Sequence, residues 1–162
     1  MSALISTFFG VGHLRPAPGT WGSLAALPAA WVLMLLGGWW LLSLGILAAF
    51  FGGLWATRAE TAGAENHDPS EIVIDEVAGQ WIALLPVALG AALTGAAPTA
   101  LYPGWIAAFL LFRLFDITKP WLVGWADRRN DPLGVMLDDV FAGIFAALGV
   151  VALAAGAHLV LM

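Results

Sequence analysis

The sequence predicts an all-α, polytopic membrane protein with about four to five membrane-embedded helices and a polar site at one face. The first reason is composition, since 61% of the 162 residues are hydrophobic and the mean hydropathy is +0.90. The second is charge placement, because every charged side chain is Arg15 or lies within Arg58–Glu76 or Arg113–Asp139. Long uncharged runs suit a bilayer, whereas clustered carboxylates need water, a metal or a counter-charge. A soluble helical bundle is the alternative, but so apolar a chain has too few polar side chains to cover its surface.

The first two apolar runs, Thr20–Gly37 and Leu41–Thr57, predict a helical hairpin that turns at Gly37-Gly38. Trp39-Trp40 follows the turn, and tryptophan is enriched where a membrane meets water. The first run contains Pro28 and is short for a span of about 20 residues. It can therefore be tilted, broken or re-entrant.

Three further apolar runs follow, Val77–Leu93, Trp105–Phe115 and Val140–Met162. The stretch Thr94–Gly104 between the first two of these predicts a turn, since it is rich in glycine and proline. The length and the single set of runs predict one domain, residues 1–162.

The order of the runs also predicts a topology. Two crossings return the chain from Arg15 to Arg58–Glu76, and two more bring it to Arg113–Asp139. All six Lys and Arg residues then lie on one side, which the positive-inside rule makes cytoplasmic. The N-terminal segment Met1–Gly12 has no basic region, so we expect no cleaved signal peptide.

Two pairs of acids precede apolar helices, Asp75-Glu76 and Asp138-Asp139, and the segments Ile72–Gly79 and Val135–Gly143 resemble each other. Adjacent carboxylates repel, so a cation should neutralise them. Oxygen ligands without cysteine favour Mg²⁺ or Mn²⁺ over Zn²⁺. The alternative is that each pair only caps a helix and complements its dipole.

A second group of candidates ends the run Trp105–Phe115. Arg113 and Asp116 are three residues apart and share a helix face. Pro120 disfavours helix at Lys119, which places Lys119 at the membrane surface. Beside the carboxylates, Arg113 and Lys119 could bind a phosphate oxyanion, whereas alone they would be an ion pair and an interfacial anchor.

A third candidate is the proline- and glycine-rich segment that starts at Arg15 and precedes the first helix. Its backbone N–H groups around Gly19, with the hydroxyls of Thr20 and Ser23, could bind an anion at a helix N-terminus. The alternative is an ordinary turn in which Thr20 caps the helix.

Four segments in this order resemble the phosphatidylglycerophosphatase A family, and the resemblance spans roughly residues 10–149. The segments are Pro18–Ala26, Ile74–Trp81, Phe112–Trp121 and Gly134–Gly143. The resemblance implies a Mg²⁺-dependent bacterial phosphatase, multi-pass in the cytoplasmic (inner) membrane with its site facing the cytoplasm. It would hydrolyse phosphatidylglycerophosphate to phosphatidylglycerol and phosphate in phospholipid synthesis. The loop Asp131-Pro132-Leu133 departs from the Gly-Gly turn expected in some members.

Combined with this resemblance, the candidates take roles in lipid phosphate hydrolysis. Asp75, Glu76, Asp138 and Asp139 are expected to be metal ligands and to act in catalysis, and Asp116 to be a further ligand or a general base. The residues expected to bind substrate are Arg15, Gly19, Thr20, Arg113 and Lys119. Which acid activates water stays open at this point.

A small ion or proton carrier is the competing class, because carboxylates at helix starts also suit a transport path. In a carrier the acids should lie near mid-bilayer, whereas here they lie at the ends of the apolar runs beside Arg and Lys. No basic tract is present, so a nucleic-acid partner is not expected.

Overall fold

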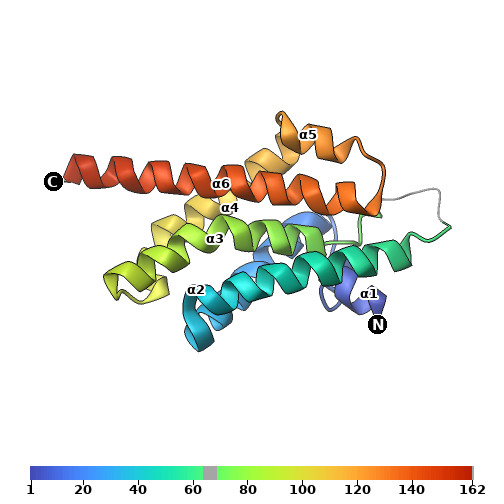
Figure 1. The fold of residues 1–162 in the computed structure, drawn as a ribbon, viewed down its shortest axis with the longest axis horizontal. Coiled ribbons are helices and arrows are strands. Elements are labelled where there is room, and N and C mark those ends of the chain that lie inside the picture. Colours follow the sequence, from blue (N-terminus) through green and yellow to red (C-terminus); the bar gives the residue numbers. More distant parts are fainter. Residues whose placement is uncertain (64–68, 162) are drawn as a thin grey trace.

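A computed structural model describes residues 1–63 and 69–161 as a bundle of helices (Figure 1). Residues 64–68, inside the charged stretch Arg58–Glu76, lie outside the described residues. The elements are α1 (Ser2–Ser6), η1 (Val11–His13), α2 (Pro18–Glu60), α3 (Ile74–Thr94), η2 (Pro98–Leu101), α4 (Tyr102–Thr118), α5 (Leu122–Asp127) and α6 (Pro132–Leu161). Four stretches of the described chain, α2, α3, η2 with α4, and α6, are long and apolar enough to cross a membrane. The prediction of a helical membrane protein is thus confirmed.

Helix α2 folds back on itself where the sequence predicts a hairpin. Gly37 and Gly38 have non-helical backbone angles, and Gly38 adopts φ +61°, a conformation that glycine takes without steric penalty. A β-carbon added at Gly45 would lie 2.9 Å from Leu33 Cδ1, which shows that the two arms pack together. The rings of Trp39 and Trp40 stack beside the turn with centroids 3.9 Å apart.

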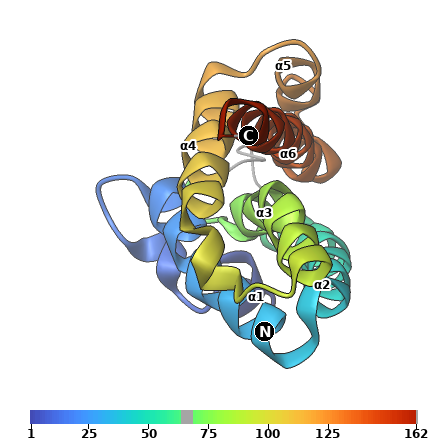
Figure 2. The same cartoon turned by 90° about the vertical axis from the view of Figure 1, so that its left-hand side faces the viewer.

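Helix α3 is the central element of the bundle. It packs against α2, α4 and α6, and Figure 2 shows it between α2 and α6. The indole N–H of Trp81 donates to the carbonyl of Ala26, 2.9 Å away, and ties α3 to the first arm of α2. Seven of the 21 residues of α3 are alanine or glycine, and such small residues let neighbouring helices approach closely, as in other membrane bundles.

Helix α6 starts earlier than the sequence analysis predicts. It begins at Pro132, so Asp138 and Asp139 lie in its second turn rather than at its start. Proline suits the first position of a helix. Asp131 then accepts a hydrogen bond from the backbone N–H of Gly134, 2.6 Å away, and so caps the helix.

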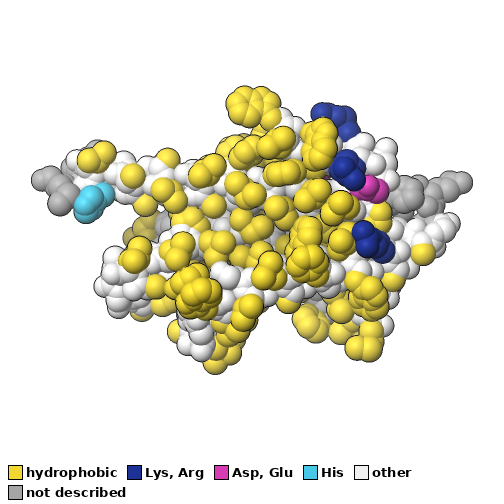
Figure 3. Space-filling model, in the orientation of Figure 1, with side chains coloured by type: hydrophobic (Ala, Val, Ile, Leu, Met, Phe, Trp, Pro, Cys, Tyr) yellow, Lys and Arg dark blue, Asp and Glu magenta, His cyan; other side chains and the backbone are white. Residues whose placement is uncertain are grey.

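The outside of the bundle is apolar along its length and charged at one end. Leu44, Phe51, Ile106 and Leu148, from α2, α4 and α6, are each more than half exposed. Figure 3 shows basic and acidic side chains gathered near one end of the visible face, with apolar side chains over the rest. The described helices thus present an apolar belt to lipid and a polar site at one end.

Candidate active site

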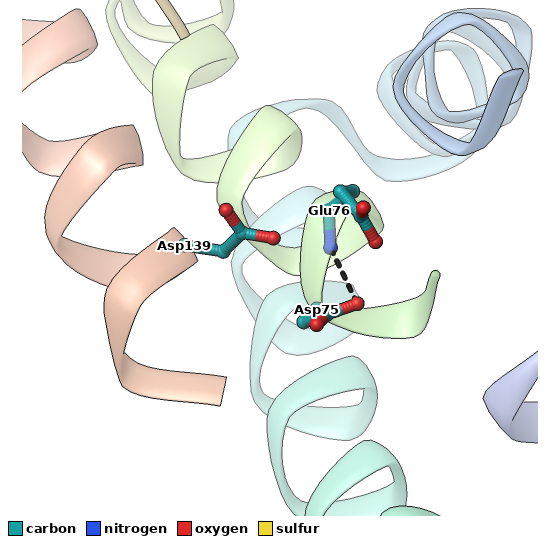
Figure 4. A group of neighbouring side chains, drawn as sticks. All are labelled: Asp75, Glu76 and Asp139. Atoms are coloured by element: carbon teal, nitrogen blue, oxygen red, sulfur yellow. Dashed lines mark hydrogen bonds between the residues drawn. The ribbon is translucent and has the colours of Figure 1, made fainter. Parts of the chain in front are cut away.

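Three carboxylates meet at the charged end of the bundle. Asp75 and Glu76 come from the first turn of α3, and Asp139 comes from α6 (Figure 4). One carboxylate oxygen from each lies within 4.8 Å of the other two. Asp75 and Asp139 are buried, so the three form a compact acidic cluster under the protein surface.

The acidic cluster has the chemistry of a divalent cation site. Oε2 of Glu76 and Oδ1 of Asp139 are buried and have no hydrogen-bond partner among the described residues. Three carboxylates at this separation repel one another strongly in an apolar environment. Hard oxygen ligands suit Mg²⁺, Mn²⁺ or Ca²⁺. The donors of Asp75, Glu76 and Asp139 therefore fit a metal ion.

Close contact between α3 and α6 brings the acids together. Gly79 follows Glu76 by three residues, and Gly143 follows Asp139 by four. A β-carbon at Gly143 would collide with the backbone of Gly79, and one at Gly79 would lie 2.5 Å from the carbonyl oxygen of Asp139. Each helix thus has a glycine about one turn after its acids, and the close contact at these glycines brings the acids of α3 and α6 together.

Asp138 faces a different partner from its neighbour. Lys119 Nζ lies 3.0 Å from Asp138 Oδ2 and also forms an ion pair with Asp127. Partial burial disfavours the ammonium form of Lys119, but hydrogen bonds to Asp127 and Asp138, with their charges, outweigh it and raise its pKa. Lys119 thus stays charged and links the end of α4 to α5 and α6. That Asp138 is a fourth metal ligand stays a prediction.

Arg113, from α4, lies next to the acidic cluster. Its Nη1 forms an ion pair with Asp116, as their spacing predicts, and lies 3.4 Å from the hydroxyl of Ser23. Its Nε is buried without a hydrogen-bond partner in the described part of the chain. Arg113 is therefore a cation held next to Glu76 by the first arm of α2.

In the segment from Arg15 to Thr20, Gly19 lies at the acidic cluster, whereas Arg15 lies away from it beside Glu71. A side chain at Gly19 would collide with Glu76 Oε1 and come within 3.3 Å of Arg113 Nη1, so the first turn of α2 touches the cluster. Arg15 instead pairs with Glu71 and donates to Ser70, 3.2 Å away. Helix α2 begins at Pro18, so Thr20 is inside its first turn and does not cap it.

Two residues near the site were not singled out from the sequence. Asp127 binds Lys119 from the short helix α5, which the apolar runs do not reveal. Gln80 is fully buried in α3, one turn beyond Glu76. Its signal in the sequence is a carboxamide inside the apolar run Val77–Leu93, where such a group has few hydrogen-bond partners.

Comparisons with known proteins agree with these features. A family model described as phosphatidylglycerophosphatase A matches residues 4–154. The chain is 37% identical over 146 residues to phosphatidylglycerophosphatase A of Escherichia coli (strain K12), which covers 89% of this chain and 78% of that protein. It is 36% identical over 151 residues to phosphatidylglycerophosphatase A of Haemophilus influenzae, with 93% and 86% covered.

A third relative is named for a different activity. The chain is 36% identical over 151 residues to a putative phosphatidylinositol-3-phosphatase of Bacteroides thetaiotaomicron, covering 90% of this chain and 88% of that protein. No solved structure matches the chain.

Proposed function

Because the chain belongs to the phosphatidylglycerophosphatase A family, we propose that its acidic cluster, with Arg113 and Lys119, is the hydrolytic site of that activity. The chain is a phosphoric monoester hydrolase that dephosphorylates phosphatidylglycerophosphate to phosphatidylglycerol. The observation that carries the proposal is a cluster of three carboxylates, two of them buried, with Arg113 and Lys119 nearby at one end of an apolar bundle.

The resident cation in this proposal is Mg²⁺, held by Asp75, Glu76 and Asp139. Asp138 is the proposed fourth ligand, and it lies next to Asp139 with Lys119 on its other oxygen. When bound, the ion would supply charge neutralisation for the phosphate oxygens. The carboxyl oxygens of Glu76 and Asp139 that lack partners support this assignment.

The phosphate group would be bound by cations and backbone N–H groups around the cluster. Lys119 uses two of its three N–H groups on Asp127 and Asp138, so the third can donate to a phosphate oxygen. Arg113 and the Gly19-Thr20 turn of α2 lie next to Glu76 and could donate to the other phosphate oxygens. Arg15 is proposed to guide the substrate from the rim, since its present partner is Glu71.

Hydrolysis requires a water oxygen to bond to phosphorus while the bond from phosphorus to the lipid oxygen breaks. The water gives its proton to a carboxylate, and the departing lipid oxygen takes up a proton. Asp116 is proposed as this base or as a further ligand, because it lies beside Arg113 at the edge of the cluster. The lipid tails would stay in the bilayer against the apolar helices.

We place the charged end on the cytoplasmic side of a bacterial inner membrane. In this orientation a lipid headgroup phosphate at the surface of the inner leaflet can reach the site. The orientation also follows the positive-inside rule. The whole chain, residues 1–162, acts as one domain in this proposal.

The test is phosphate release by purified protein. Phosphatidylglycerophosphate, phosphatidylinositol 3-phosphate and soluble glycerol phosphate are compared with Mg²⁺ present and with the ion chelated. We expect turnover of the first lipid with Mg²⁺, little on glycerol phosphate, and loss on chelation. Asp139→Asn should abolish turnover in folded protein, because it removes one ligand charge. Asp131→Asn is the matched control, since Asp131 is a half-exposed helix cap and asparagine caps equally well.

Near-normal turnover of Asp139→Asn, or of wild type without divalent ions, would reject the proposed site. Faster turnover of phosphatidylinositol 3-phosphate would instead align the substrate preference with the Bacteroides relative.

A further inference from the structure

A carboxamide lies fully buried below the acidic cluster. Gln80 has no solvent exposure, and neither its Nε2 nor its Oε1 has a hydrogen-bond partner among the described residues. Leaving a buried polar group unpaired destabilises a protein, and such groups are uncommon in native folds. Methionine or leucine would fill the same space without this cost, so the carboxamide has to be explained by something other than packing.

The position of Gln80 on α3 points it toward the site. Gln80 follows Glu76 by four residues, so both side chains lie on one face of the helix. Val87, seven residues further along the same face, lies against Gly104 of α4. Helix α4 also carries Arg113. The face of α3 that carries Gln80 is therefore the one that packs on α4.

Gln80, Glu76 and Arg113 each have a buried polar atom without a hydrogen-bond partner in the described chain, and these atoms include both donors and acceptors. Nε of Arg113 and Nε2 of Gln80 are donors, and Oε2 of Glu76 is an acceptor. A water molecule can donate to a carboxylate and accept from an N–H at the same time. This combination suits the nucleophile of a hydrolysis better than it suits an anion, which could only accept.

We propose that the Gln80 carboxamide, together with Glu76, binds and orients the water that attacks phosphorus. The inference rests on the proposed hydrolytic site. Gln80 donates an N–H to the water oxygen and takes no proton itself. The water proton passes to a carboxylate, the oxygen bonds to phosphorus, and the lipid oxygen leaves with a proton. Holding the water at a fixed angle lowers the barrier chiefly by orientation.

The test is Gln80→Met, which keeps the length of the side chain and removes both hydrogen-bonding groups. We expect kcat to fall roughly 100-fold, as when one aligned donor is lost from an active site, with KM for phosphatidylglycerophosphate within about threefold of wild type. The thermal midpoint in detergent should rise by roughly 2–4 °C, because the substitution removes the buried Oε1, which the proposed water leaves unpaired. Binding of Mn²⁺ alone, measured by calorimetry, should be unchanged.

Leu84→Met is the matched control. Leu84 is fully buried one turn further along the same face of α3, and it has no polar group to lose. Its kcat should match wild type. A kcat near wild type in Gln80→Met, or an equal loss in Leu84→Met, would overturn the inference.

A second variant keeps the test decisive if Gln80→Met does not fold. Gln80→Asn retains the carboxamide but withdraws it by one methylene, so kcat should still fall, and an unchanged kcat would overturn the inference. Asp139→Asn, assayed in parallel, separates the two proposals. Loss in both Asp139→Asn and Gln80→Met supports both. Loss in Asp139→Asn alone overturns only the role of Gln80, whereas loss in Gln80→Met alone overturns the acidic cluster and the pairing of Gln80 with Glu76.

Discussion

Lys119, which we propose to bind the substrate phosphate, also connects three helices of the fold. It ends α4 with φ +46°, directly before Pro120, and its ammonium group binds Asp127 of α5 and Asp138 of α6. The pKa of Lys119 is raised because these two carboxylates outweigh the effect of burial. A permanent point charge is thereby fixed beside Asp138, the sequence neighbour of Asp139 in the acidic cluster.

The prediction at the scale of the residue concerns this ammonium. If Lys119 binds a phosphate oxygen in the transition state, Lys119→Ala should lower kcat/KM strongly, since it removes that charge and leaves Asp138 without its partner. Lys119→Arg should restore only part of the loss, because a planar guanidinium fork does not replace a compact ammonium at a fixed site. The measurement is steady-state hydrolysis of phosphatidylglycerophosphate at saturating Mg²⁺.

A simple interfacial anchor would behave differently. Arginine reaches the membrane surface as well as lysine does. Full activity in Lys119→Arg, with only reduced stability in Lys119→Ala, would move Lys119 out of the active site.

Residue types and spacing identify most of these side chains, but not how they pair. Four acids in two pairs predict a metal site, and the structure brings three of them together. Asp138 and Asp139 are neighbours in sequence but point about 100° apart on a helix, so only the rotation of α6 against α3 decides which one joins Glu76. Gln80 escapes notice because an isolated polar residue gives no spacing to recognise, and Asp127 because it is one of several charged residues in the stretch Arg113–Asp139.

At the scale of elements, the contact between α3 and α6 sets the geometry of the site. Gly79 and Gly143 lie against each other's backbone, within one turn of Glu76 and Asp139. Small residues at such crossings let helix backbones approach closely in membranes. The separation of the carboxylates therefore depends on two positions that carry no functional group.

This contact predicts that Gly143→Ala lowers both stability and turnover. The new β-carbon meets backbone atoms of Gly79, which cannot move aside as a side chain can. We expect a loss of about 1–3 kcal/mol in stability, typical of an overpacked core, and a drop in kcat because Asp139 moves away from Glu76. Thermal midpoints in detergent and phosphate release measure the two effects.

Gly156→Ala is the control on the same helix, because a β-carbon there meets nothing within 4 Å. Its stability should be unchanged or slightly higher, since alanine favours helix. Equal effects of the two substitutions would show that helix propensity, and not the α3–α6 contact, is responsible.

Element boundaries can be predicted from the sequence where glycine or proline restricts or frees the backbone. Gly37-Gly38 turns α2 because the backbone there leaves helical angles, and Pro120 ends α4. The start of α6 is missed because the sequence analysis places it at the acidic pair Asp138-Asp139. The helix instead begins at Pro132, six residues before Asp138, with Asp131 as its cap. Helix α5 is too short to show an apolar period.

At the scale of the whole molecule, charge is segregated to one end of the bundle. The ion pairs of Arg15, Arg113, Lys119 and Arg129 with nearby acids all lie in the loops or helix ends predicted to share one side. The sequence predicts this arrangement because two apolar runs, an even number, separate each charged segment from the next. The direction in which the bundle inserts depends on the membrane rather than on contacts within the chain, so it stays a prediction.

Cysteine labelling measures that direction, and the chain has no native cysteine to interfere. Thr99→Cys lies in η2, at the uncharged end of the bundle, and should react with an impermeant reagent added to intact cells. Asn130→Cys lies at the charged end and should react only after the membrane is opened. Both native residues are exposed, so accessibility within the protein does not bias the comparison. Labelling of Asn130→Cys in intact cells would place the site outside.

The length of α6 has a consequence for the lipid around it. Its 30 residues extend about 45 Å, whereas the hydrocarbon core of a bilayer is about 30 Å thick. Residues 151–159 are all exposed, so no neighbouring helix in the described chain covers that part of α6. Such a hydrophobic mismatch is relieved by tilting the helix or by thickening the bilayer locally. Since α6 is fixed to α3 at Gly143, its tilt also sets how Asp139 approaches Glu76, and membrane thickness becomes a parameter of the active site.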